Sequence, residues 1–181
     1  MKKTALIIIG GFAGAGKTTA AKKLSALNNL PLVSTDELND ELRKILQCDF
    51  KTASPHAHDL AWAIVQKYLE NGTSVILDTN MCHDRTWKNV DDLTRRMPDI
   101  DVLPIILQCS LETHRQRIEE RGRTNALHLN LGGDDFEDII HKYEYIESLK
   151  REDLIRINAE ASVDEVYRNI VSYLEDVRRP S

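Results

Sequence analysis

Short apolar segments alternate with longer amphipathic segments along the chain. Several of the apolar segments are rich in isoleucine and valine, and polar positions rarely interrupt them. This pattern is typical of strands in a sheet that helices cover on both faces. On this basis we expect strands at Ala5–Gly10, Leu30–Ser34, Ser74–Asp78, Val102–Gln108 and Leu154–Asn158.

The longer segments carry apolar residues at helical spacing. In His58–Glu70 these residues form one stripe, and Asn71-Gly72 provides a stop signal. Ser162 and Glu165 have the spacing of a capping box. Helices are expected at Gly16–Leu27, Glu37–Gln47, His58–Glu70, Arg85–Met97, Leu111–Arg121, Phe136–Leu149 and Val163–Val177. Strands that alternate with helices in this way predict right-handed crossovers and a parallel α/β sheet in three layers.

Composition narrows the class of protein. A length of 181 residues suits one domain, 1–181, and a net charge of −5 argues against a broad nucleic-acid surface. Cys48, Cys82 and Cys109 lack the spacing of metal or redox motifs, which favours reduced thiols. No apolar run approaches the ~20 residues of a membrane span. We therefore expect a soluble cytoplasmic protein that does not bind membranes.

A glycine-rich segment follows the first apolar run. Residues 11–18, GFAGAGKT, match G-x-x-x-x-G-K-[ST] in full, between an expected strand and an expected helix. The glycines let backbone N–H groups surround phosphate oxygens, Lys17 reaches the outer phosphates, and Thr18 offers a hydroxyl to Mg²⁺. The residues expected to bind nucleotide here are Gly11, Ala13, Gly14, Ala15, Gly16, Lys17, Thr18 and Thr19.

The remaining motifs decide what the triphosphate is used for. GTPases need DxxG and NKxD motifs, and ABC-type ATPases need LSGGQ, but the chain contains none of these. The chain is also short for an AAA+ machine with its additional helical lid. A phosphotransferase remains, and it needs a base, a metal ligand and mobile cations.

Asp36 is the candidate base. It follows the second expected strand, at the edge of the sheet where ligands bind, and could accept the proton of an attacking hydroxyl. Ser34 and Glu37 also have capping-box spacing, so an acid there could instead serve the helix dipole.

Asp78 is the candidate metal ligand. It closes the apolar run SVILD, which is the Walker-B arrangement of a residue that holds Mg²⁺ or its water. The alternative is an aspartate that begins an Asp-Thr-Asn turn.

The candidate cations are Arg115, Arg117, Arg121 and Arg123. Arg117 and Arg121 share a helical face, and the segment after them suits a small lid at approximately 115–135. Arg121 is the favoured cation for the charge that develops in phosphoryl transfer, and Arg117 is expected at the nucleotide. The alternative is a solvated charged helix.

Together, the segments GGFAGAGKTT, STDEL, VILDTNMCHDR and RQRIEER resemble the AAA-domain family of small P-loop kinases. This family includes polynucleotide 5′-hydroxyl kinases, zeta-toxin kinases, chloramphenicol phosphotransferase and gluconate-kinase-like proteins. The resemblance implies ATP and Mg²⁺ as cofactors, Asp36 as base, Arg121 as lid arginine and an adenine site near Asn158. Asp78-Thr79-Asn80 is similar to the polynucleotide kinase branch, but Asn39 replaces an arginine of that branch.

The expected fold is thus a P-loop NTPase three-layer sandwich, like that of nucleoside and nucleotide kinases, with a five-stranded parallel sheet and a small helical lid. The expected function is transfer of the ATP γ-phosphate to a hydroxyl of a small molecule. A polynucleotide 5′-hydroxyl kinase and a P-loop ATPase that switches a protein partner remain the alternatives. The sequence leaves open the acceptor, the oligomeric state, and whether Cys82 or Trp87 lines the acceptor pocket.

Overall fold

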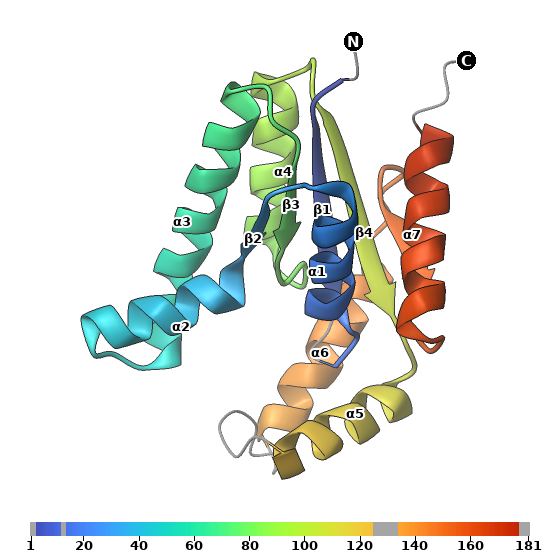
Figure 1. Ribbon diagram of the computed structural model, residues 1–181. Coiled ribbons are helices and arrows are strands. Elements are labelled where there is room, and N and C mark those ends of the chain that lie inside the picture. The colour runs from blue at the N-terminus through green and yellow to red at the C-terminus, as the bar shows by residue number, and fades with distance from the viewer. Residues whose placement is uncertain (1–2, 12–13, 125–133, 178–181) are drawn as a thin grey trace.

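The computed structural model describes residues 3–11, 14–124 and 134–177, except for the side chains of residues 115, 118, 119, 121–124 and 134–139. Five parallel strands form one sheet in the order β2-β3-β1-β4-β5 (Figure 1). The strands are β1 (Ala5–Gly11), β2 (Leu32–Ser34), β3 (Val75–Asp78), β4 (Asp101–Gln108) and β5 (Ile155–Asn158). The expected parallel α/β sheet is confirmed.

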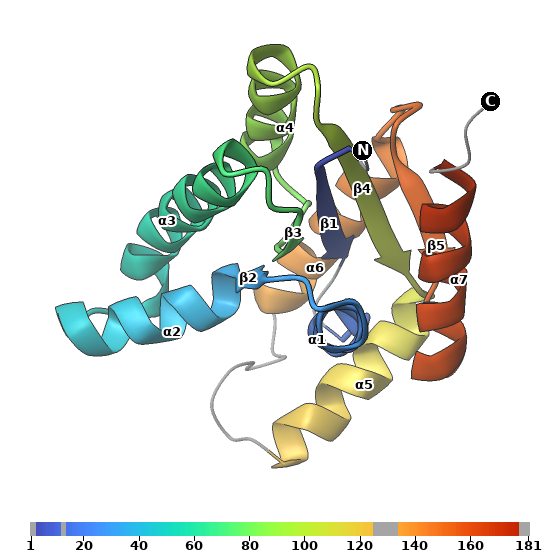
Figure 2. The same cartoon turned by 45° about the horizontal axis from the view of Figure 1, so that its top comes forward.

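Helices cover both faces of the sheet, as Figure 2 shows. The helices are α1 (Lys17–Asn28), α2 (Thr35–Leu46), α3 (Phe50–Glu70), α4 (Asp84–Arg96), α5 (Leu111–Thr124), α6 (Asp134–Ser148) and α7 (Val163–Val177). Successive residues of β1 divide between two cores, because Ile7 packs with α1 and α7, whereas Ile8 packs with α3 and α4. This alternation produces the three layers.

Helix α3 is longer than the sequence pattern predicts. We expected it to begin at His58, but it begins at Phe50 and continues through Pro55. The Asp49 side chain caps this additional part by accepting a hydrogen bond from the backbone N–H of Thr52 at 2.8 Å. The added turns place α3 along α2, against which it packs.

The register of the sheet brings three chain segments together at one edge. Asp78, the last residue of β3, pairs with Ile9 of β1 on one side and with Ser34 of β2 on the other. Just beyond Ile9, Gly11 has a φ of 133°, and a Cβ there would stand 2.4 Å from the carbonyl oxygen of Leu107. The carboxyl ends of the strands are therefore close-packed, and only glycine fits where the P-loop begins. No described helix is long and apolar enough to span a membrane.

Candidate active site

The glycines of the P-loop turn the chain from β1 into α1. Gly14 and Gly16 have φ angles of 85° and 86°, which side chains with a Cβ rarely adopt, and α1 begins directly afterwards at Lys17. The expected strand–loop–helix context of the motif is therefore present. Ala13 lies outside the described residues.

Thr18 and Asp78 meet below this loop. The hydroxyl of Thr18 donates a hydrogen bond to Oδ2 of Asp78 at 2.7 Å, and the Ser34 hydroxyl donates to the same oxygen at 3.3 Å. The other carboxylate oxygen of Asp78 is buried without a hydrogen-bond partner, and the residue is only 2% exposed. A buried carboxylate oxygen without a hydrogen-bond partner, next to a threonine hydroxyl, is a pair of ligands that suits Mg²⁺.

The surroundings of Asp78 change its acidity. Burial raises the pKa of its carboxyl above the ordinary value, and the negative charge of Asp36 adds to the increase. The positive charge of Lys17 and the hydrogen bond from Thr18 oppose this rise in pKa. Lys17 and Asp36 therefore both act electrostatically on Asp78, although the three residues come from three different strand ends.

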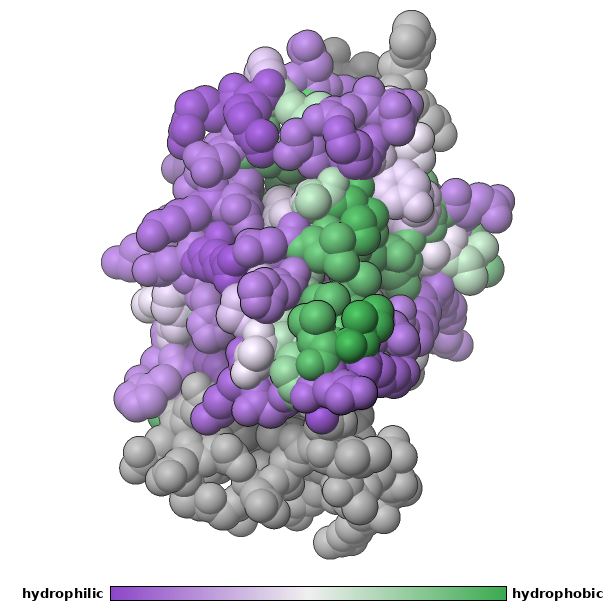
Figure 3. All heavy atoms as spheres, turned by 90° about the vertical axis from the view of Figure 1, so that its left-hand side faces the viewer, coloured by the Kyte–Doolittle hydropathy of each residue, from purple (hydrophilic) through white to green (hydrophobic). Residues whose placement is uncertain are grey.

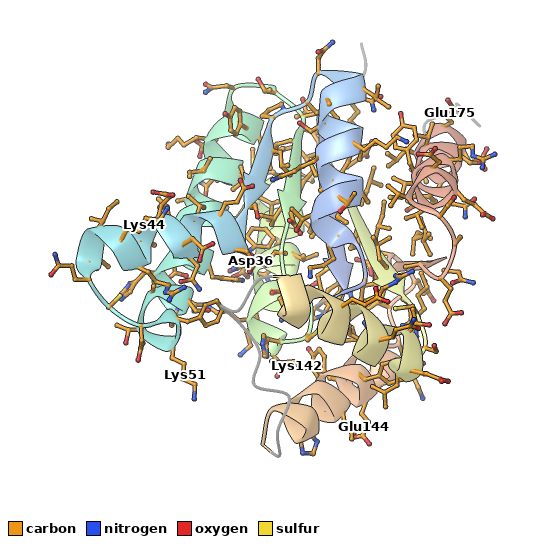
Figure 4. All side chains as sticks on the ribbon, turned by 60° about the horizontal axis from the view of Figure 1, so that its bottom comes forward. Asp36, Lys44, Lys51, Lys142, Glu144 and Glu175 are labelled. Carbon is orange, nitrogen blue, oxygen red and sulfur yellow. The ribbon has the colours of Figure 1, made fainter. Side chains whose placement is uncertain are left out.

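Asp36 lies in the first turn of α2, where the sequence predicts it. Its side chain is exposed, and Figure 4 shows it at the inner end of the helix, whereas Lys44 lies at the outer end. Lys22 of α1 and Glu37 form an ion pair at 2.8 Å that joins the P-loop helix to this turn. The capping-box interpretation of Ser34 is wrong, because its side chain makes no cap hydrogen bond and contacts Asp78 instead.

A cavity of about 520 Å³ adjoins the P-loop. Arg117 lies at its wall and donates a hydrogen bond to the carbonyl oxygen of Ala159 at 2.8 Å. It thereby joins α5 to the β5–α7 loop. The cavity is lined by Gly14, Ala15, Gly16, Thr19, Ala20, Arg117, Glu120, Ala159, Ala161, Ser162, Val163 and Val166. Its position beside the phosphate loop and its mostly small and apolar lining suit a nucleotide base.

Asn158 does not line this cavity. Its side-chain oxygen accepts the backbone N–H of Glu160 at 2.9 Å, and the residue borders a separate cavity of about 310 Å³. The residues after it, beginning with Ala159, border the cavity beside the P-loop instead. The loop that we expected at the adenine thus borders the cavity beside the P-loop, although Asn158, the residue singled out within it, does not. Because residues alternate sides along an extended segment, the neighbours of Asn158 were the better candidates.

Helix α5, which carries the candidate arginines, is fixed at its start. The Glu160 carboxylate accepts a hydrogen bond from the backbone N–H of Ser110 at 2.8 Å. This contact lowers the pKa of Glu160, because the hydrogen bonds from Ser110 favour the ionised form. The side chains of Arg115, Arg121 and Arg123 and the expected lid segment 125–133 lie outside the described residues.

Cys82, Trp87 and Asn39 are all buried. Trp87 and Cys82 are buried within one hydrophobic cluster, and the Trp87 indole N–H donates to the carbonyl oxygen of Met81 at 3.2 Å. Trp87, which the sequence left open, is thus part of the hydrophobic core. Asn39, one turn after Asp36, is 2% exposed, and its side-chain oxygen has no hydrogen-bond partner. Sequence reasoning noted Asn39 only as a departure from a family pattern.

Among the described residues, no group of three or more His, Cys, Asp or Glu side chains could hold a metal ion. Mg²⁺ does not require such a group, because it keeps several waters and takes one or two protein ligands beside the phosphates. The pair of Thr18 and Asp78 is consistent with this mode of binding.

Comparisons with known proteins place this geometry in a family. The model of a family described as AAA domain matches residues 6–146. No significant match was found among curated proteins.

Solved structures share the fold at low sequence identity. A provisionally assigned kinase from Chloroflexus aurantiacus j-10-fl has a TM-score of 0.72 and 18% identity, over 97% of this chain and 98% of that chain. A gluconokinase from Sinorhizobium meliloti 1021 has a TM-score of 0.63 and 13% identity, over 98% and 94%. A shikimate kinase from Aquifex aeolicus vf5 has a TM-score of 0.64 and 17% identity, over 94% and 96%. The fold is that of small P-loop kinases.

Proposed function

The chain belongs to the AAA domain family, and from this premise we propose that it is an ATP-dependent phosphotransferase. It transfers the γ-phosphate of ATP to a hydroxyl of a small molecule, with Asp36 as general base. The similar gluconokinase and shikimate kinase are named for small hydroxylated acids, which supports an acceptor of this size.

The observation that carries the proposal is the contact between Thr18 and Asp78. It joins the P-loop hydroxyl to a buried carboxylate at 2.7 Å, and the charges of Lys17 and Asp36 both act on that carboxylate. A glycine-rich turn in a merely structural role would have no reason to bury an aspartate with an open oxygen at this point.

Thr18 and Asp78 are the residues that would hold Mg²⁺, directly or through its waters. When bound, the ion would supply positive charge against the negative charge that develops on the phosphate during transfer. Lys17 binds the outer phosphates, and the cavity beside Arg117 receives the base.

Asp36 supplies the acid–base step. Its carboxylate takes the proton of the acceptor hydroxyl as that oxygen attacks the γ-phosphorus. The bond between the γ-phosphorus and the bridging oxygen breaks, and ADP leaves with the electron pair. Exposure of Asp36 suits this role, because an acceptor must reach the carboxylate from solvent.

A screen with γ-labelled ATP tests the proposal. Hydroxylated acids, sugars, nucleosides and 5′-hydroxyl oligonucleotides are incubated with protein and Mg²⁺, and labelled product is separated from free phosphate. We expect label on a small acceptor, and loss of that label in Asp36→Asn. Label on oligonucleotides alone would make the protein a nucleic-acid end kinase. Hydrolysis independent of every acceptor would favour an ATPase that switches a partner.

A further inference from the structure

Asn80, two residues beyond the end of β3, carries an amide group that the fold uses only in part. Its side-chain oxygen accepts the backbone N–H of Cys82 at 2.8 Å. Only the oxygen of an amide can accept an N–H, so this contact fixes which way the amide group is turned. Within the described part of the chain, the amide nitrogen of Asn80 donates no hydrogen bond. Its two N–H groups are therefore available to a bound molecule.

The chain around Asn80 continues β3 beyond its last residue. The backbone N–H of Thr79 donates to the carbonyl oxygen of Ile9 at 3.2 Å, which continues the pairing of β3 with β1. Leu77 and Met81 both pack into the core that α3 and α4 cover. Side chains alternate between the two sides of an extended segment, so Asn80 lies on the opposite side from these two residues.

Asn80 shares its side of this segment with Asp78. That is the side of the P-loop, because Asp78 contacts Thr18 there. A rise of about 3.3 Å per residue places the Cα of Asn80 about 7 Å beyond that of Asp78. Asp78 is buried, whereas Asn80 is partly exposed. In the proposed function Asp78 holds Mg²⁺, so Asn80 lies on the solvent side of that position, from which the acceptor approaches the γ-phosphate.

The backbone of Asn80 is held in place by the helices behind it. The hydroxyl of Thr86 in α4, a residue 1% exposed, donates to the carbonyl oxygen of Asn80 at 3.0 Å. The same hydroxyl lies 3.3 Å from Nε2 of His58 in α3. A donor that is held in this way loses little side-chain freedom when it binds a ligand atom.

Helix α2, which carries Asp36 in its first turn, has a different kind of surface farther along. Figure 3 shows apolar surface on the side of the molecule that α2 and α3 form, where Ile45 and Phe50 are 72% and 47% exposed. Apolar side chains do not hydrogen-bond to the oxygens of a hydroxylated acceptor. Polar contacts to such an acceptor are therefore expected at the strand ends, where Asp36 and Asn80 lie.

We propose that Asn80 donates a hydrogen bond to a second oxygen of the acceptor, next to the hydroxyl that Asp36 deprotonates. This inference rests on the proposed function and names the class of acceptor. The acceptor is a compound with two neighbouring oxygens, such as a vicinal diol or a hydroxy acid, and Asn80 determines specificity for it. An acceptor without the second oxygen leaves the N–H groups of Asn80 without a partner, which lowers its kcat/KM.

Acceptors that differ by one hydroxyl test the proposal. D-ribose, D-glucose, D-gluconate and adenosine are each compared with their monodeoxy analogues, with γ-labelled ATP as donor. For a compound that the wild-type protein phosphorylates, we expect one deoxy analogue to have a kcat/KM roughly tenfold lower. In Asn80→Ala this difference should shrink to about twofold or less, because the donor is gone, and the KM for ATP should stay nearly unchanged.

Asn80→Asp separates recognition of the acceptor from a structural role. Aspartate keeps an oxygen for the N–H of Cys82 but has no N–H to donate. We therefore expect Asn80→Asp to keep the Tm of the wild-type protein and to lose selectivity between acceptors as Asn80→Ala does. Asn71→Asp is the matched control, since it adds the same charge at the exposed end of α3, before β3 begins. It should keep the selectivity.

Two results overturn the proposal. In the first, label is transferred, but the wild-type protein, Asn80→Ala and Asn80→Asp discriminate equally between each acceptor and its deoxy analogues. The proposed function then stands, and Asn80 serves only the turn before α4. In the second, the wild-type protein labels no compound of the panel. If ATP is then hydrolysed independently of every acceptor, the proposed function fails as well.

Discussion

Thr18 and Asp78 are 60 residues apart in the chain, yet the hydroxyl of one donates to the carboxylate of the other at 2.7 Å. The contact links the start of α1 to the end of β3 and uses the two groups that Mg²⁺ would require. If Mg²⁺ binds here with ATP as proposed, it would replace this hydrogen bond, which in the free protein holds the two proposed ligands together.

Replacing Asp78 should therefore separate stability from activity. The carboxylate of Asp78 is buried with one oxygen unpartnered, which costs free energy whenever the group is ionised. We expect Asp78→Asn to raise Tm in the absence of ligands. It should also raise the Mg²⁺ concentration needed for half-maximal turnover by about 10–100-fold. Differential scanning fluorimetry and a Mg²⁺ titration of turnover measure the two effects. A lower Tm with an unchanged Mg²⁺ requirement would contradict the assignment.

The same carboxyl predicts a pH dependence. Its pKa is raised in the folded protein, so the folded state binds the proton more tightly than the unfolded state. The stability that this proton provides is complete below the unfolded pKa and is lost as pH rises through the folded pKa. The Tm advantage of Asp78→Asn should consequently grow as pH rises above about 4, the ordinary pKa of an aspartate, and level off above the folded pKa. A Tm advantage that does not change with pH above about 4 would contradict the raised pKa of Asp78.

Lys17 should be needed for both ATP binding and turnover. Lys17→Ala removes the cation from the outer phosphates, and we expect turnover to fall by about 10²–10³-fold or more, with ATP affinity at least roughly tenfold lower. Lys67→Ala, at an exposed lysine paired with Glu70, is the matched control. Calorimetry with ATP and Mg²⁺ measures binding. If Lys17→Ala kept its ATP affinity and its turnover, the assignment of residues 11–18 as a P-loop would be wrong.

The positions of strands and helices could be predicted from the sequence because each element has one dominant signal. Strands β1 and β4 are buried on both faces and are therefore continuously apolar. The expected cap of α7 is confirmed at Ser162, since its hydroxyl accepts the backbone N–H of Glu165 at 3.3 Å. The start of α3 was missed because Pro55 breaks the helical pattern, although Asp49 and Thr52 cap the turns before it.

The site was predictable where a residue type and a strand end coincide, as at Asp78. It was less predictable where tertiary packing decides which way a side chain points. Ser34 has the sequence spacing of a cap, but the parallel pairing of β2 with β3 places its hydroxyl at Asp78. Asn158 and Ala159 border different cavities, because successive side chains of an extended segment point to opposite sides. The sequence alone does not show which of the two faces the P-loop.

The P-loop glycines should tolerate substitution unequally. A Cβ at Gly11 would stand 2.4 Å from a backbone oxygen of β4, which a side-chain rearrangement cannot relieve. Gly11→Ala should therefore cost at least about 3 kcal/mol of unfolding free energy, from overlap and backbone strain together. Gly16→Ala has open space and a φ of 86°, so only about 1–2 kcal/mol is expected. Urea denaturation of both variants tests the order, and equal costs would contradict it.

Asp36 should fail differently from every other residue of the site. If its carboxylate takes the acceptor proton, Asp36→Asn lowers kcat by roughly 10²–10⁴-fold and leaves ATP affinity nearly intact. The control is Glu37→Gln, which removes one negative charge from the same helical turn and breaks only the exposed pair with Lys22. A similar loss in both variants would indicate that the charge of this turn, rather than the base, is what turnover needs. Near-normal kcat of Asp36→Asn with the true acceptor would leave Asp36 as a residue of the α2 terminus. The proton would then have to leave by another route. Among the groups that shift the pKa of Asp78, Asp36 is the only carboxylate.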